Sequence, residues 1–160
     1  MADPSAKKPN VRAKILRHLI QTSLLLGGGI ASILSLTTWF QRQSIVRGLT
    51  TNAAVQSTCL AIFPAVLITQ VCKGLAYPVN GIIMGGLDWV FTMLAMWAAN
   101  FVCVGMIYGW KMTAPGAGGL VSLNQIWWAL AAFMATQVVT GIVRYNSQTG
   151  VWKALRVNEK

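Results

Sequence analysis

Residues 69–92, TQVCKGLAYPVNGIIMGGLDWVFT, decide the fold, because they begin inside one long apolar run and end inside the next. They contain Lys73, the one lysine expected at membrane depth, and Asp88, the one acidic residue outside the two ends of the chain. Proline and glycine residues interrupt the segment at Gly74, Pro78, Gly81, Gly85 and Gly86. The stretch therefore predicts two membrane-spanning helices joined by a turn, and any chemistry of the chain is expected to involve it.

The composition indicates a membrane protein. The 160 residues are 55% hydrophobic and only 10% charged, with a mean hydropathy of +0.57. Soluble domains carry about a quarter charged residues, which this chain lacks. The chain has 13 Lys+Arg against 3 Asp+Glu. The basic residues lie mostly beside apolar runs, as the positive-inside rule describes. The expected partner is therefore the lipid bilayer, and nucleic acid is not expected.

The residues needed for a metal site or for catalysis are scarce. Cys59, Cys72 and Cys103 lie inside apolar runs without a CxxC pair, and His18 is the single histidine. This pattern predicts no metal site, no disulfide framework and no cofactor. One histidine and one interior carboxylate cannot supply a catalytic triad or paired carboxylates. The sequence therefore predicts a protein without catalytic residues, which is not an enzyme.

Four apolar runs are long enough to cross a bilayer as helices, for which about 20 residues suffice. They predict an all-α polytopic membrane protein with an antiparallel four-helix transmembrane domain over residues 19–143. The spans are expected at about 19–40, 53–83, 89–108 and 123–143. Residues 1–18 are expected to form a basic, disordered or interfacial tail, and residues 144–160 a basic C-terminal tail. The positive-inside rule places both tails on the cytosolic or stromal side, although two arginines in the connection 41–52 weaken the rule here.

Three polar residues of the second span are candidates for a cavity between the helices: Gln70, Lys73 and Asn80. A lysine near the end of a span can extend its ammonium group to the lipid headgroups. It can instead face a water-filled cavity and contact a substrate. Position alone favours the headgroups, but the sequence leaves both roles of Lys73 open.

The turn after the second span combines two glycines with an acidic residue. Gly85 and Gly86 predict a tight turn, and Asp88 is predicted to cap the next helix by accepting from exposed backbone N–H groups.

Several residues are predicted to act in helix packing or at the membrane interface. In lipid, small residues allow two helices to approach closely, which is the expected role of Gly27, Gly28 and Gly29. The amide of Asn100, in the middle of the third span, is expected to bond another helix. Arg144, which closes the fourth span, is expected to anchor it at the interface.

The segment 63–91, FPAVLITQVCKGLAYPVNGIIMGGLDWVF, resembles the C-terminal half of MATE-type transporters (multidrug and toxic compound extrusion), most closely the plant plastid branch and its bacterial relatives. The resemblance rests on the order and spacing of Thr69-Gln70, Asn80-Gly81 and Gly85-Gly86-Leu87-Asp88. The segment 123–155 resembles the last helix and tail of that branch, at Trp127, Phe133-Met134, Gly141, Arg144, Thr149-Gly150 and Trp152-Lys153. The similarity runs over roughly residues 11–156 and covers about the last four of the twelve helices of the family.

The resemblance implies part of one of two six-helix lobes that enclose a central cavity. It implies export of a small organic substrate in exchange for H⁺ or Na⁺, with both termini on the cytosolic side. The sequence departs from the family at three positions: Lys73 stands where members often have Asn, Asn80 where they have Asp, and Gln137 where they have Arg. The coupling carboxylate that the family usually has in its other lobe is not in this chain.

Two functions follow as alternatives. The first is a MATE-like transporter of which this chain is a part that is not active alone. The second is a non-transporting structural subunit of a larger membrane complex, for which a plastid membrane is one location.

Overall fold

The computed structural model describes residues 8–113, 121–147 and 149–155, and this part of the chain is almost entirely helical. The described elements are α1 (Lys8–Leu49), α2 (Ala53–Gly85), α3 (Trp89–Thr113), α4 (Leu123–Ser147) and a short 3₁₀-helix, η2 (Gly150–Leu155). Each of the four α-helices is long and apolar enough to cross a membrane. The predicted all-α fold with four candidate membrane spans is thus confirmed.

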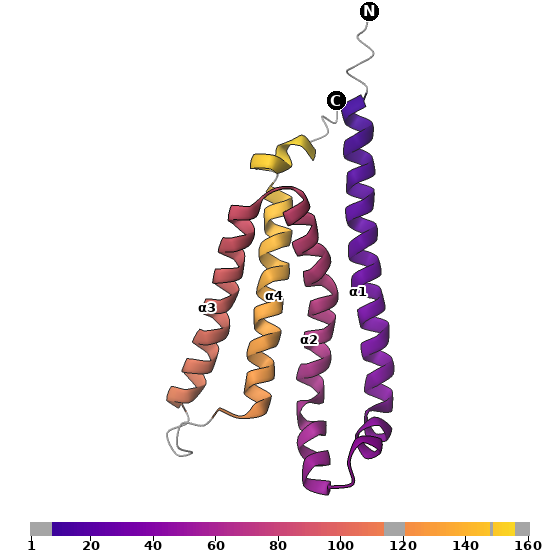
Figure 1. The fold of residues 1–160 in the computed structure, drawn as a ribbon, viewed down its shortest axis with the longest axis vertical. Helices are drawn as coiled ribbons and strands as arrows, with labels where there is room; N and C mark the ends of the chain where they lie inside the picture. The colour runs from indigo at the N-terminus through magenta and orange to yellow at the C-terminus, as the bar shows by residue number, and fades with distance from the viewer. Residues whose placement is uncertain (1–7, 114–120, 148, 156–160) are drawn as a thin grey trace, which may run out of the picture.

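The helices pack side by side in the order α1, α2, α4, α3 (Figure 1). Consecutive helices run antiparallel, so the neighbouring α2 and α4 point the same way. Helices α2 and α3 have few contacts with each other, although they are consecutive, because α4 lies between them. The bundle is therefore an open row, with α1 and α3 at its two edges.

Helix α1 is longer than the predicted span at both ends. It begins at Lys8 and continues to Leu49, so residues 8–18 and 41–49, expected as tail and connection, are helical. Hydropathy shows how far the chain stays apolar, whereas the helix can continue into polar residues. No proline between Pro9 and Leu49 ends this helix. Residues 1–7 of the predicted tail lie outside the described residues. Helix α2 begins at Ala53, where Asn52 Oδ1 caps it by accepting from Ala54 N at 2.9 Å.

Helices α1 and α2 approach closely at a pair of glycines. A Cβ atom on Gly27 would lie 2.5 Å from the carbonyl oxygen of Gly74 and 2.8 Å from Pro78 Cγ. A Cβ on Gly74 would collide with the Cβ of Ala31. Only residues without a side chain allow the two backbones to come this near, the usual reason for small residues between helices in lipid.

The segment 144–160, expected as a basic tail, is partly built into the fold. Arg144 lies in the last turn of α4, and η2 crosses that end of the bundle (Figure 1). Trp152 of η2 is buried with Ile20 of α1 and with Val79 and Ile83 of α2. The ring of Trp152 lies over Gly86, where a Cβ would be 2.8 Å from it. The beginning of α1, the α2–α3 turn and η2 therefore share one end of the bundle, and residues 156–160 lie outside the description.

Candidate functional site

The candidate site is a groove between α1 and α2. It has a volume of about 700 Å³ and runs past Gln70, Lys73 and Tyr77 of α2, opposite Ser35 and Thr38 of α1. The three residues of α2 are three and four positions apart, so they share one side of the helix. Gln70 and Tyr77 are exposed and Lys73 is half-buried. The polar positions predicted at Gln70 and Lys73 therefore line one groove, and Tyr77 belongs with them.

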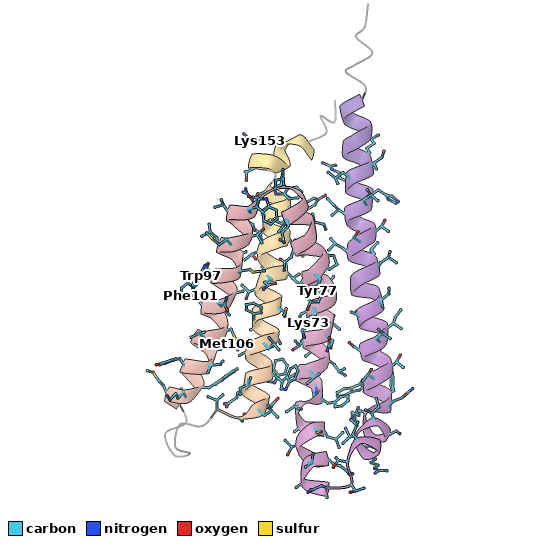
Figure 2. All side chains as sticks on the ribbon, viewed as in Figure 1. Lys73, Tyr77, Trp97, Phe101, Met106 and Lys153 are labelled. Carbon is cyan, nitrogen blue, oxygen red and sulfur yellow. The ribbon has the colours of Figure 1, made fainter. Side chains whose placement is uncertain are left out.

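Lys73 lies near mid-height of the bundle, on the stretch of α2 that runs beside α4 (Figure 2). At 1.5 Å per residue, it precedes Gly85 by roughly 18 Å, while the 25-residue helices α3 and α4 are each about 37 Å long. A bilayer centred on these helices would thus place Lys73 near its midplane. The headgroups would be about 15 Å away, farther than an extended lysine side chain reaches. This depth favours the groove over the headgroups.

Asn80 lies apart from this groove. Its Nδ2 donates to Oε1 of Gln137 on α4 at 2.8 Å, and Gln137 is only 5% exposed. A buried amide without a partner is costly, so the two amides satisfy each other across the α2–α4 interface. The structure therefore assigns Asn80 a helix-to-helix contact, in place of the cavity-facing role expected beside Lys73.

Asp88 forms the centre of a polar cluster at the end of the bundle. Its Oδ2 accepts from Arg144 Nε at 2.7 Å and from Trp152 Nε1 at 3.3 Å. The guanidinium of Arg144 also donates to Thr149 Oγ1 at 2.8 Å and lies 5.1 Å from the ring of Phe91. The cluster ties the α2–α3 turn to the end of α4 and to η2. Asp88 and Arg144, expected separately as a helix cap and an interface anchor, are partners.

The hydrogen bond from Arg144 lowers the pKa of Asp88 below its ordinary value. The positive charge of Arg144 and the N–H groups of Trp152 and Phe91 act in the same direction, and partial burial opposes them. The N–H of Phe91 is the smallest of these causes, so the capping role of Asp88 stays a prediction.

The lowered pKa predicts a stability that depends on pH. Because Asp88 releases its proton more readily in the folded chain, its contribution is fully present above the unfolded pKa of about 3.9. It is lost as the pH falls through the lower, folded value. We expect Asp88→Asn to remove about 1.5–3 kcal/mol at pH 7, the usual range for hydrogen bonds to charged groups, and to remove much of this acid dependence.

Unfolding of the chain in nonionic detergent between pH 7 and pH 2.5, monitored by circular dichroism, measures both effects. The other two acidic residues lie outside the described part of the chain, and Lys153→Ala, an exposed change beside the cluster, serves as the control. An acid dependence as steep in Asp88→Asn as in the unchanged chain would contradict the ion pair as its source.

The predicted turn is present, but its glycines do not carry the unusual backbone conformation. The N–H of Gly86 donates to Ile82 O and closes α2. The positive φ, 60°, falls on Leu87, a conformation that costs an L-residue about 1–2 kcal/mol. Gly86 is needed for the space under Trp152, whereas a Cβ on Gly85 would meet nothing within 4 Å.

Two predicted packing residues differ from expectation. A Cβ on Gly29 would meet nothing within 4 Å, so Gly29 does not share the contact of Gly27, or that of Gly28 with Leu75. Asn100 is exposed and donates to Met96 O of its own helix at 3.1 Å. The predicted contact of Asn100 with another helix is therefore not seen among the described residues.

The contacts of three residues were not predicted from the sequence, each for a different reason. Tyr77 had a usable signal, because it follows Gln70 and Lys73 at helical spacing. Gln137 was visible as an amide at membrane depth, yet nothing in the sequence paired it with Asn80. Trp152 lies in a polar segment, and its burial arises from residues far away along the chain.

Among known proteins, Protein DETOXIFICATION 43 of Arabidopsis thaliana is 29% identical to this chain over 93 residues. The match covers 58% of this chain but only 16% of the relative. No family model matches the chain, and no solved structure matches it. The chain therefore has distant, partial similarity to a plant MATE protein.

Proposed function

We propose that this chain contributes four membrane helices to a MATE-like transporter, which exports small organic compounds in exchange for H⁺ or Na⁺. The similarity to a plant MATE protein carries the proposal, and the four candidate spans are compatible with it. Within the described spans there is no carboxylate at membrane depth, since Asp88 lies in the α2–α3 turn. We therefore expect the coupling cation to bind elsewhere in the transporter and the chain to be inactive alone. The shared end of α1 and η2 is proposed to face the cytosol or stroma, with a plastid membrane as a location.

A structural subunit of a larger membrane complex is the second candidate. The open row favours it, because α1 and α3 expose many large apolar side chains, among them Leu25, Phe40, Trp97 and Phe101. Such surfaces suit lipid or the helices of another protein. In this case the groove would serve assembly without transport.

One preparation tests both functions. The chain is solubilised from its native membrane in mild detergent, and native mass spectrometry identifies everything that travels with it. The same particle is then reconstituted in liposomes with an imposed pH or Na⁺ gradient, and uptake of ethidium is measured. We expect a particle with further membrane helices that takes up the dye, and no uptake by the purified chain alone. A large particle of fixed stoichiometry without gradient-driven uptake would support the structural subunit and contradict the transporter.

A further inference from the structure

The groove between α1 and α2 contains polar groups that the described chain leaves without partners. Neither Lys73 nor its neighbours Gln70 and Tyr77 has a side-chain hydrogen bond or an ion pair within residues 8–113, 121–147 and 149–155. The described acidic residue, Asp88, is bonded to Arg144 at the end of the bundle, beyond the end of α2, which is roughly 18 Å along the helix from Lys73. A positive charge at mid-height of the bundle thus has no counter-charge in the described chain.

Lipid tails are a poor cover for this surface. An unpaired lysine at the bilayer centre is unfavourable even on the mildest insertion scales, and such residues face protein or water instead. The exposed amide of Gln70 and hydroxyl of Tyr77 lie on the same side of α2 and add to this cost. The groove is therefore expected to be covered by something that carries polar, negatively charged groups.

The shape of the groove indicates what covers it. Its lining extends from Phe63 to Tyr77 on α2 and from Gly27 to Thr38 on α1, roughly 21 Å and 16 Å along the bundle axis. It is thus elongated along the membrane normal and spans more than half of the hydrocarbon core. The small residues Gly27, Ala31 and Gly74, which allow α1 and α2 to approach closely, form one part of the lining. Apart from Lys73, Gln70 and a few hydroxyl groups, the lining is apolar.

We propose that this groove is the docking surface for a further transmembrane helix, and that this helix carries a carboxylate at mid-membrane depth to pair with Lys73. The charge of Lys73 specifies the acidic partner, and the length and apolar lining of the groove specify a helix. Gln70 and Tyr77, about one turn to either side of Lys73, can donate to the same carboxylate or to polar groups beside it. The inference rests on the proposed function only in placing the chain among further membrane helices.

The test uses the full chain in dodecyl maltoside, which contains no phosphate and no charged lipid. The probe is a synthetic, fluorescently labelled Leu/Ala-rich helix with one central Glu, and its matched control has Gln in that position. Association with the labelled chain is measured by resonance energy transfer. We expect the Glu helix to bind about tenfold more tightly than the Gln helix, as for other close charge pairs. Lys73→Met should abolish this preference, and Lys111→Met, at the exposed end of α3, should keep it.

Charge reversal makes the test independent of any general effect on folding. Lys73→Glu should lose the Glu helix and gain preference for a helix with a central Lys, while circular dichroism verifies that the variants remain helical. Equal binding of the Glu and Gln helices, or a preference that survives Lys73→Met, would overturn the proposal. A third outcome would also overturn it: the small carboxylate 2-naphthoate binds in a manner that depends on Lys73, while the Glu helix does not bind. The groove would then bind a free anion and not a helix.

The result is separable from the proposed function. Charge-dependent association in micelles requires no gradient and no transport. The docking proposal can therefore be supported even if the native particle takes up no dye. Conversely, gradient-driven uptake by the native particle would leave the transporter proposal intact if the Glu helix showed no preference.

Discussion

Trp152→Ala is expected to lower the free energy of unfolding by about 3 kcal/mol, the lower part of the range for deleting a buried aromatic side chain. Trp152 is only 4% exposed, and its ring packs with residues of α1 and α2 while covering Gly86. The substitution leaves a cavity where three elements meet and removes a hydrogen bond to Asp88. Denaturation in detergent micelles, followed by circular dichroism, measures the loss without relying on the fluorescence of the deleted residue.

Two neighbouring changes separate packing from hydrogen bonding. Trp152→Phe keeps most of the ring but lacks the indole N–H, so it should cost only about 1 kcal/mol. Lys153→Ala alters an exposed side chain of the same 3₁₀-helix and should be close to neutral. A loss in Trp152→Ala no larger than that in Lys153→Ala would show that η2 does not hold α1 and α2 together.

Gly27→Ala is expected to push α1 away from α2 and to cost about 2–3 kcal/mol, as overpacking of a close contact usually does. The new methyl group would lie 2.5 Å from the Gly74 carbonyl oxygen, and a backbone atom cannot move aside as a flexible side chain can. Spin labels on the exposed positions Gln43 and Thr58, in a cysteine-free background, would report a longer and broader α1–α2 distance.

The same glycine run offers a matched control. Gly29→Ala makes the identical chemical change two residues away, where a Cβ meets nothing within 4 Å. It should leave the distance unchanged and be neutral or stabilising by up to about 1 kcal/mol, because alanine is the better helix former. Equal effects of the two substitutions would contradict a specific contact at Gly27.

Much of the fold could be predicted because two local signals agree. The apolar runs place α2, α3 and α4, and Asn52 and the Gly85-Gly86 pair mark the limits of α2. Helix α1 extends beyond the predicted span 19–40, because the helix continues through polar residues to Leu49. The apolar runs therefore locate the helices but do not give their full lengths.

The site was harder to predict, because it depends on which helices become neighbours. Composition identified Lys73, Asn80 and Asp88 as unusual, but only the packing order separates the groove at Lys73 from the amide pair of Asn80 with Gln137. Asp88 and Arg144 are 56 positions apart in the chain, and no local pattern links them. Likewise, the sequence of three adjacent glycines does not reveal which of them face α2.

The position of α4 between α2 and α3 has a consequence for biogenesis. Spans enter the membrane in the order of translation. Helices α2 and α3 are therefore made before α4, the helix that packs between them. Until α4 arrives, Asn80 is without its amide partner and Asp88 without its guanidinium. The amide pair and the ion pair that fix the order of the row can therefore form only after α4 has been made.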